Sequence, residues 1–175
     1  MGVLPVSIEM LKRHYPARPD LTPELTRFMA TITGTSCCVQ LSHALNLAGE
    51  RVPQTYARQR RNNSPITTRG TVYYYLLAVD EVEQYLTGRY GAGEEVSKTD
   101  SGQPRTHQQI QAYLQGRTGI LAFRDTGYGK HAELWDGHQI VQRDMAEAAI
   151  FSQPRVLFWD CGPAQWLQDY MAKQV

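Results

Sequence analysis

Residues 34–46, GTSCCVQLSHALN, read as a loop that turns into a helix with a thiol in its first turn. Thr35 and Ser36 suit the N-terminal cap of this helix, because their hydroxyl groups can accept hydrogen bonds from backbone amides that lack partners there. Gly49 suits its C-terminal end. The N-terminus of a helix carries a partial positive charge that favours a thiolate over a thiol. A cysteine at this position is therefore a candidate nucleophile.

The two adjacent cysteines fall on different faces of the predicted helix. Cys38 continues the apolar stripe of Leu41 and Leu45, which predicts a structural place in the core. Cys37 is rotated by about 100° from that stripe and can face a cleft. Burial is the more common fate of a cysteine without a disulfide, so both thiols also have a purely structural interpretation. Of the two, Cys37 is the better candidate nucleophile.

Length and charge exclude several classes of function. The 175 residues suit one domain, residues 1–175, that buries a real core. A formal net charge of +1 gives no indication of nucleic-acid binding. The chain has no run of about 18 apolar residues that would insert into a membrane. Because the N-terminus lacks the basic and apolar pattern of a signal peptide, we expect synthesis in the cytoplasm without one.

The cysteine pattern predicts neither a disulfide framework nor a metal site. The chain has 3 cysteines, an odd number. A bridge between Cys38 and Cys161 stays open for an oxidising compartment. Neither a Cys-x-x-Cys pair nor a paired-histidine spacing is present, so we expect no metal ligand set. Catalysis by a thiol also needs no cofactor.

Local signals place most helices before the main run of strands, which predicts an α+β chain. Possible capping boxes start helices at Asp80 with Glu83 and at Thr106 with Gln109. Helices are expected near residues 8–15, 22–32, 36–48, 80–86, 106–115 and 145–151, and again after Gly162. Strands are expected at residues 71–77, 120–123, 130–135, 138–142 and 156–159.

The dipeptide Asp136-Gly137 is a strong signal for a two-residue β-hairpin turn. Such a turn would pair Trp135 with His138. Counting outward along both strands then places His131 directly opposite Gln142.

His131 is the candidate base. It shares one strand face with Glu133 and Trp135, because side chains alternate along a strand. Two groups could orient its imidazole: the Gln142 amide opposite, or the Asp144 carboxylate one diagonal step further. A base held in the right tautomer by a third group is what thiol catalysis requires.

Each of these residues also has a simpler interpretation. His131 could be a surface histidine after a glycine turn, and Asp144 could be a helix cap. His138, which adjoins the turn, is the main competitor for the role of base.

Two motifs together resemble a known family. Residues 37–46, CCVQLSHALN, and residues 129–137, GKHAELWDG, are similar to segments of the papain-like (NlpC/P60-related) amidase effectors of type VI secretion, in particular the fourth family of those effectors. The resemblance spans roughly residues 34–160. It implies a papain-like (NlpC/P60-type) α+β fold, with N-terminal helices and the nucleophile helix packed on an antiparallel sheet.

The resemblance also implies a function. Such an enzyme is delivered into the periplasm of a rival bacterium, where it hydrolyses the bond between D-glutamate and diaminopimelate in peptidoglycan stem peptides. Effectors of this kind are carried by a spike or tube component of the secretion apparatus, and a cognate immunity protein blocks them.

The family's catalytic residues fall on positions of this chain. The nucleophile matches Cys37 and the base matches His131. The third member is assigned to Asp144, with Gln142 as the alternative. Backbone amides of Cys37 and Cys38, at the helix start, would stabilise the oxyanion.

The resemblance further implies substrate contacts by Gln40, Glu133 and Trp135. Two of these positions depart from the family pattern: Gln40 replaces an arginine and Glu133 replaces an aspartate. We therefore expect the chemistry to be retained and the substrate contacts to differ.

Two other functions are compatible with the same residues. A papain-like toxin could use the same triad to deamidate or cleave a host protein. Alternatively, the chain could be a non-enzymatic binding module in which Cys37 and His131 never meet.

Overall fold

The computed structural model describes residues 3–16, 23–31, 36–56, 66–68, 70–142 and 146–162. Asp144, a candidate for the third catalytic position, lies outside these residues, as does the helix expected after Gly162.

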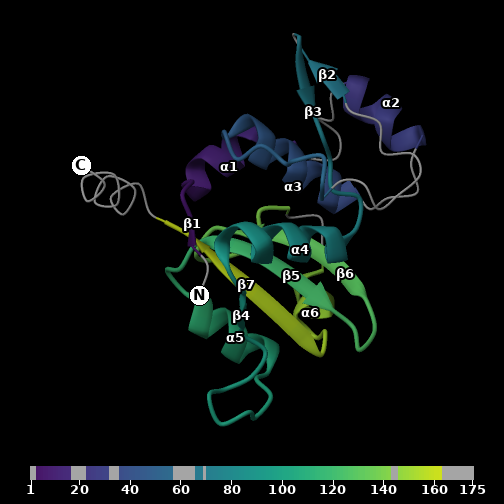
Figure 1. Cartoon of the computed structure of the whole chain (residues 1–175). Helices are drawn as coiled ribbons and strands as arrows, with labels where there is room; N and C mark the ends of the chain where they lie inside the picture. The colour runs from purple at the N-terminus through teal and green to yellow at the C-terminus, as the bar shows by residue number, and fades with distance from the viewer. Residues whose placement is uncertain are drawn as a thin grey trace.

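The centre of the fold is a five-stranded sheet in which strand β7 has neighbours on both sides (Figure 1). On one side β7 pairs antiparallel with β5, and β5 pairs antiparallel with β6. On the other side β7 pairs antiparallel with β4 and parallel with β1. The strands are β1 (Val3–Leu4), β4 (Glu94–Glu95), β5 (Gly119–Arg124), β6 (Gly129–Trp135) and β7 (Arg155–Cys161).

Helices cover both faces of this sheet. Alternate residues of β5 separate the two cores: Ile120 and Ala122 join one cluster, and Leu121 and Phe123 join the other. The first cluster includes side chains from α1 (Ile8–His14), α3 (Ser36–Leu47) and α4 (Val79–Tyr90). The second includes side chains from α5 (His107–Leu114) and α6 (Glu147–Phe151). The expected antiparallel sheet with the cysteine helix packed on it is therefore present, with β1 as a parallel addition.

A smaller sheet stands beside α2 (Pro23–Thr31), away from the main sheet (Figure 1). It pairs β2 (Ile66–Thr68) with β3 (Thr71–Tyr73). The segment after β3 contributes Tyr75 and Leu77 to a third core cluster with Leu25 and Phe28 of α2. The strand expected at residues 71–77 thus ends early, at Tyr73.

Helix α3 ends where the sequence predicts. Gly49 has a backbone φ of +98°, a conformation that glycine adopts without the steric cost of a side chain. The chain reverses there, and the amide of Glu50 donates to the carbonyl of Leu45 at 2.9 Å. This hydrogen bond satisfies one of the carbonyl groups that the last helical turn leaves without a partner.

Two polar residues of α3 attach the helix to its surroundings. The hydroxyl group of Ser42 donates to the carbonyl of Cys38 at 2.7 Å and accepts from the amide of Leu76 at 2.9 Å. The side chain of Asn46 donates to the carbonyl of Tyr74 at 2.8 Å and accepts from the amide of Val52 at 2.8 Å. Both side chains are buried. The polar positions of the segment SHALN therefore hold α3 in place.

Replacement of Ser42 by alanine should lower the free energy of unfolding by about 1–3 kcal/mol, because the buried amide of Leu76 loses its acceptor. Urea denaturation followed by circular dichroism measures this loss. Ser152→Ala is the matched control, since the exposed Ser152 hydroxyl donates only to the carbonyl of Ala149. A Ser42→Ala variant as stable as that control would contradict the anchoring role.

The hairpin after β6 differs from the sequence prediction. Trp135 pairs with Ile140, not with His138, so the turn has four residues and not two. The carboxylate of Asp136 accepts from the amides of His138 and Gln139 at 3.1 and 3.0 Å, which stabilises the longer turn. The prediction of a two-residue turn is wrong because the aspartate side chain binds backbone amides inside its own loop.

The two capping boxes have different outcomes. At α5 the Thr106 hydroxyl accepts from the amide of Gln109, and the Gln109 side chain accepts from the amide of Thr106. The box at α4 is wrong: that helix begins after Ala78 without a side-chain cap, and Asp80 lies inside it. The Asp80 carboxylate instead accepts hydrogen bonds from Arg124 and from the amide of Gly129.

Candidate active site

Helix α3 brings Cys37 to the imidazole of His131. Cys37 lies in the first turn of α3, with 3% of its surface exposed, and its side chain is hydrogen-bonded to His131. The adjacent Cys38 is fully buried in the core, and its sulfur lies 3.9 Å from that of Cys37. Both thiols belong to the first core cluster, and the predicted difference in their roles stays a prediction. A thiol at the start of a helix, Cys37, thus contacts a histidine on a strand, His131.

The His131 ring is held on three sides. It stands on β6 with 8% of its surface exposed. The Phe123 ring stacks against it, with 6.1 Å between ring centroids and 27° between planes. Its Nε2 atom lies 3.3 Å from Oε2 of Glu133. A ring fixed by stacking, by a carboxylate and by a thiol has little freedom to rotate.

The surroundings of His131 favour its protonated form. Burial acts against the charge and lowers the pKa, but the hydrogen bonds to Cys37 and Glu133 and the charges of both groups outweigh burial. Together they raise the pKa of His131 from 6.5 to about 9. The imidazole is thus protonated at neutral pH beside a sulfur atom that can carry the negative charge.

This raised pKa makes the His131 contribution to stability dependent on pH. Because the folded protein binds the proton more tightly than the unfolded chain, the contribution is complete below about pH 6.5 and disappears as the pH rises through about 9. We expect the difference in unfolding free energy between the native protein and His131→Asn to shrink across that interval. Urea titrations of both proteins at several pH values measure it. A difference that stays constant would contradict the charged pair.

Gln142 does not contact His131 as the two-residue turn implied. Val141 donates its backbone amide to the carbonyl of Leu134 at 2.9 Å, next to the Trp135–Ile140 pair. Continuing this register by one step places Gln142 across from Glu133. The Gln142 side chain is buried and accepts a hydrogen bond from Nε2 of Gln40 at 2.9 Å.

The three predicted substrate contacts all lie inside the protein. Gln40, Glu133 and Trp135 have no exposed surface. Gln40 also donates to the carbonyl of Pro16 at 2.7 Å. The indole of Trp135 packs in the second core cluster and donates to the carbonyl of Leu114 at 3.0 Å. All three side chains are therefore interior in this structure, and their contact with substrate stays a prediction.

Sequence reasoning missed Tyr15, which follows α1. Its hydroxyl group is buried beside Glu133 and Cys37, without a well-aligned hydrogen-bond partner among the described residues. Burial, followed by the negative charges of Glu133 and Cys37, raises the pKa of this phenol far above its ordinary value. Tyr15 therefore remains a neutral phenol at the site. Only the folded chain reveals it, because no local pattern connects a tyrosine after the first helix to a distant strand.

The start of β6 is fixed against α4, which sets the position of His131. The amide of Gly129 donates to the Asp80 carboxylate at 3.2 Å. A Cβ atom on Gly129 would lie 2.3 Å from the Cβ atom of Val79, so this close approach requires glycine. His131 follows two residues later on the same strand.

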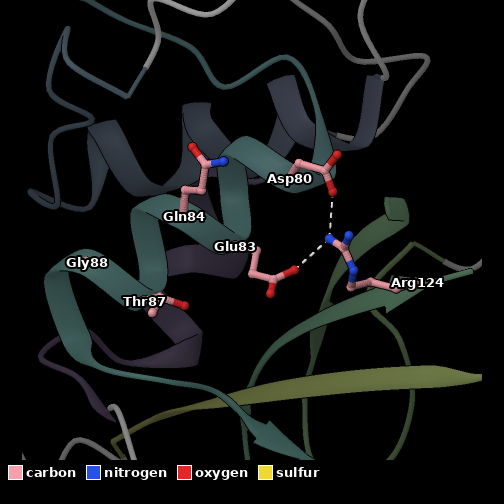
Figure 2. A pocket seen from close by; sticks show the side chains of 6 residues that line it. All are labelled: Asp80, Glu83, Gln84, Thr87, Gly88 and Arg124. Atoms are coloured by element: carbon pink, nitrogen blue, oxygen red, sulfur yellow. Dashed lines mark hydrogen bonds and ion pairs between the residues drawn. The ribbon is translucent and has the colours of Figure 1, made fainter. Parts of the chain in front are cut away.

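Arg124 of β5 joins the same region to α4. Its guanidinium donates to Asp80 and to Glu83 at 2.6 Å each. Figure 2 shows both contacts. These residues line a surface pocket together with Gln84, Thr87 and Gly88. The pocket presents two carboxylates already paired with one arginine, and this pairing ties the sheet to the helix.

Two other histidines are engaged elsewhere. His138, the competitor for the role of base, lies at the exposed hairpin turn, where its Nδ1 is 2.7 Å from Nε2 of Gln115. His43 of α3 contacts the hydroxyl group of Tyr75 at 3.1 Å. Burial lowers the pKa of His43.

Three findings apply to the part of the chain that the structure describes. Cys38 and Cys161 are separate buried thiols, so no disulfide joins them. No group of three or more histidine, cysteine, aspartate or glutamate side chains is arranged to hold a metal ion. None of its helices has the length and apolar character needed to cross a bilayer.

A known protein family matches most of the chain. The model of the family described as "Type VI secretion system (T6SS), amidase effector protein 4" matches residues 34–159, well over half of the chain. No curated protein matches the chain.

Solved structures share the fold. The type VI effector Tae4 from Enterobacter cloacae has a TM-score of 0.61 and 16% identity, over 93% of this chain and 100% of that one. Tae4 from Salmonella typhimurium, solved in complex with the immunity protein Tai4 from Enterobacter cloacae, has a TM-score of 0.60 and 16% identity, over 90% of this chain and 99% of that one. These likenesses confirm the papain-like α+β fold expected from the sequence.

Proposed function

The chain belongs to the family of type VI secretion amidase effector protein 4, and on this premise we propose that it hydrolyses peptidoglycan with Cys37 as nucleophile and His131 as base. The bond that we assign is the amide between D-glutamate and diaminopimelate of stem peptides. The single observation that carries the catalytic assignment is the hydrogen bond between Cys37 and an imidazole whose pKa is raised to about 9. A thiol next to such a group is activated as a nucleophile.

The proposed reaction proceeds by acyl transfer. His131 holds the proton of Cys37, and the thiolate attacks the carbonyl carbon of the amide. The negative charge that develops on the carbonyl oxygen is stabilised by the backbone amides of Cys37 and Cys38, which lack helical acceptors in the first turn of α3. His131 then donates its proton to the leaving amine of diaminopimelate. Water, deprotonated by His131, hydrolyses the thioester and restores the thiol.

We further propose how the enzyme reaches its substrate. It is carried by a spike or tube component of the secretion apparatus and released in the periplasm of the target cell. A cognate immunity protein would bind it there. The support for such a partner is that the Salmonella typhimurium and Enterobacter cloacae effectors were solved in complex with Tai4.

Digestion of purified peptidoglycan tests the assigned bond. Mass spectrometry of the soluble products should show fragments that end in D-glutamate, together with fragments that carry a newly released diaminopimelate amine. Digestion that leaves every D-glutamyl–diaminopimelate bond intact would overturn this assignment. Products cut at another amide would support the hydrolase activity and assign it to a different bond.

A further inference from the structure

In the structure the carboxylate that contacts His131 belongs to Glu133, which the sequence does not indicate as the third member of the catalytic group. Glu133 has no exposed surface, and each of its carboxylate oxygens has a contact. Oε1 accepts from the amide of Leu134 at 2.8 Å, and Oε2 lies 3.3 Å from Nε2 of His131. A carboxylate buried this deeply needs a hydrogen-bonded or charged partner. Here the charged partner is the imidazole itself.

The side chain of Gln142, the alternative third member, is hydrogen-bonded to Gln40. Its side-chain oxygen accepts from Gln40, and its amide nitrogen has no partner among the described residues. The four-residue turn also moves Gln142 away from the position opposite His131. Gln142 and Gln40 therefore form a buried amide pair that supports the neighbouring chain at Pro16.

Tyr15 also restricts the position of the Glu133 carboxylate. Its buried hydroxyl group faces the carboxylate and is kept as a neutral phenol by its surroundings. A phenol beside a carboxylate restricts where the carboxylate can lie, even where the hydrogen bond is not well aligned. The carboxylate is thus surrounded by the amide of Leu134, the imidazole of His131 and this phenol.

We propose that Glu133 is the positioning residue that orients and charges His131, in the role that the sequence assigned to Asp144 or Gln142. Its carboxylate accepts a hydrogen bond from the Nε2–H group, which leaves Nδ1 as the ring nitrogen available to Cys37. This proposal rests on the proposed thiol mechanism and specifies which residue completes it. It does not depend on which peptidoglycan bond is cut.

A proton titration of His131 by NMR in the native protein and in Glu133→Gln tests the proposal without any substrate. Loss of the carboxylate should move the pKa of His131 from about 9 towards its ordinary value of 6.5. Glu83→Gln is the matched control, because Glu83 is a partly buried carboxylate paired with Arg124 at 2.6 Å. It should leave the His131 titration unchanged. An unchanged titration in Glu133→Gln would overturn the proposal.

The same variants give a kinetic test. In Glu133→Gln, kcat should fall at least about tenfold, with the roughly 10⁴-fold loss that follows a wrong histidine tautomer as the upper limit. The alkaline limb of the kcat/KM profile should move to lower pH, because the working form carries a protonated His131. Glu133→Asp should recover part of both effects, and it replaces Glu133→Gln if that variant does not fold. A larger loss in Asp144→Asn, with a normal profile in Glu133→Gln, would return the role to Asp144.

Discussion

Replacement of Cys37 by alanine should abolish the release of soluble fragments from purified peptidoglycan, a loss of about 10⁴-fold or more in kcat. The reason is that Cys37 is the thiol hydrogen-bonded to His131, whose pKa is raised. Assays of newly released amino groups in isolated cell walls measure the rate. Expression of the variant in the periplasm of a test strain should leave those cells intact.

Cys161→Ala is the matched control for this experiment. Cys161 is a buried thiol on β7, and burial raises its pKa, so it is an inert structural group. We expect full activity from this variant and a modest loss of stability from the small cavity. Residual activity near the native level in Cys37→Ala would move the nucleophile to another residue.

Replacement of His131 by asparagine should lower kcat by about 10²- to 10⁴-fold, which is the usual contribution of a general base and acid. The same change should remove the reactivity of Cys37 towards iodoacetamide at about pH 6, where an ordinary thiol is almost fully protonated. Because Cys37 is only 3% exposed, the comparison uses native protein under identical conditions as its reference.

His138→Asn is the control for the histidine variant. His138 lies at the exposed hairpin turn, next to Gln115 and away from the thiol. It should retain both the hydrolysis rate and the alkylation rate. Loss of activity in His138→Asn, together with normal alkylation of Cys37 in His131→Asn, would assign the role of base to His138.

Short-range signals in this chain predicted the elements well. Thr106 and Gln109 form the expected capping box, and Gly49 takes the left-handed backbone that ends α3. Such features depend on neighbours within a few residues, which the sequence displays directly. One failure comes from competition over a longer distance. Asp80 binds Arg124 and Gly129 and does not cap its helix, and neither partner is near it in the chain.

Helix position and strand alternation depend on local periodicity, so the sequence alone makes Cys37 and His131 candidates, and their catalytic roles stay predictions. The candidates for the third group differ between sequence and structure, because they depend on the register of one hairpin and on a buried charge. An Asp-Gly pair indicates a turn but does not set its length, and the Asp136 carboxylate stabilises a longer one. A fully buried glutamate is unusual, so the sequence alone favours a contact with substrate for Glu133 and gives no sign of its contact with His131.

The pairing of Cys37 with His131 is tested most directly by titrating the His131 ring protons by NMR in the native protein and in Cys37→Ala. The native ring should titrate at about pH 9, and the pKa should fall when the thiol is removed, because the hydrogen bond and the charge of Cys37 help to raise it. A native ring that titrates near 6.5, and is unaffected by the loss of the thiol, would show that the two side chains do not form a reactive pair.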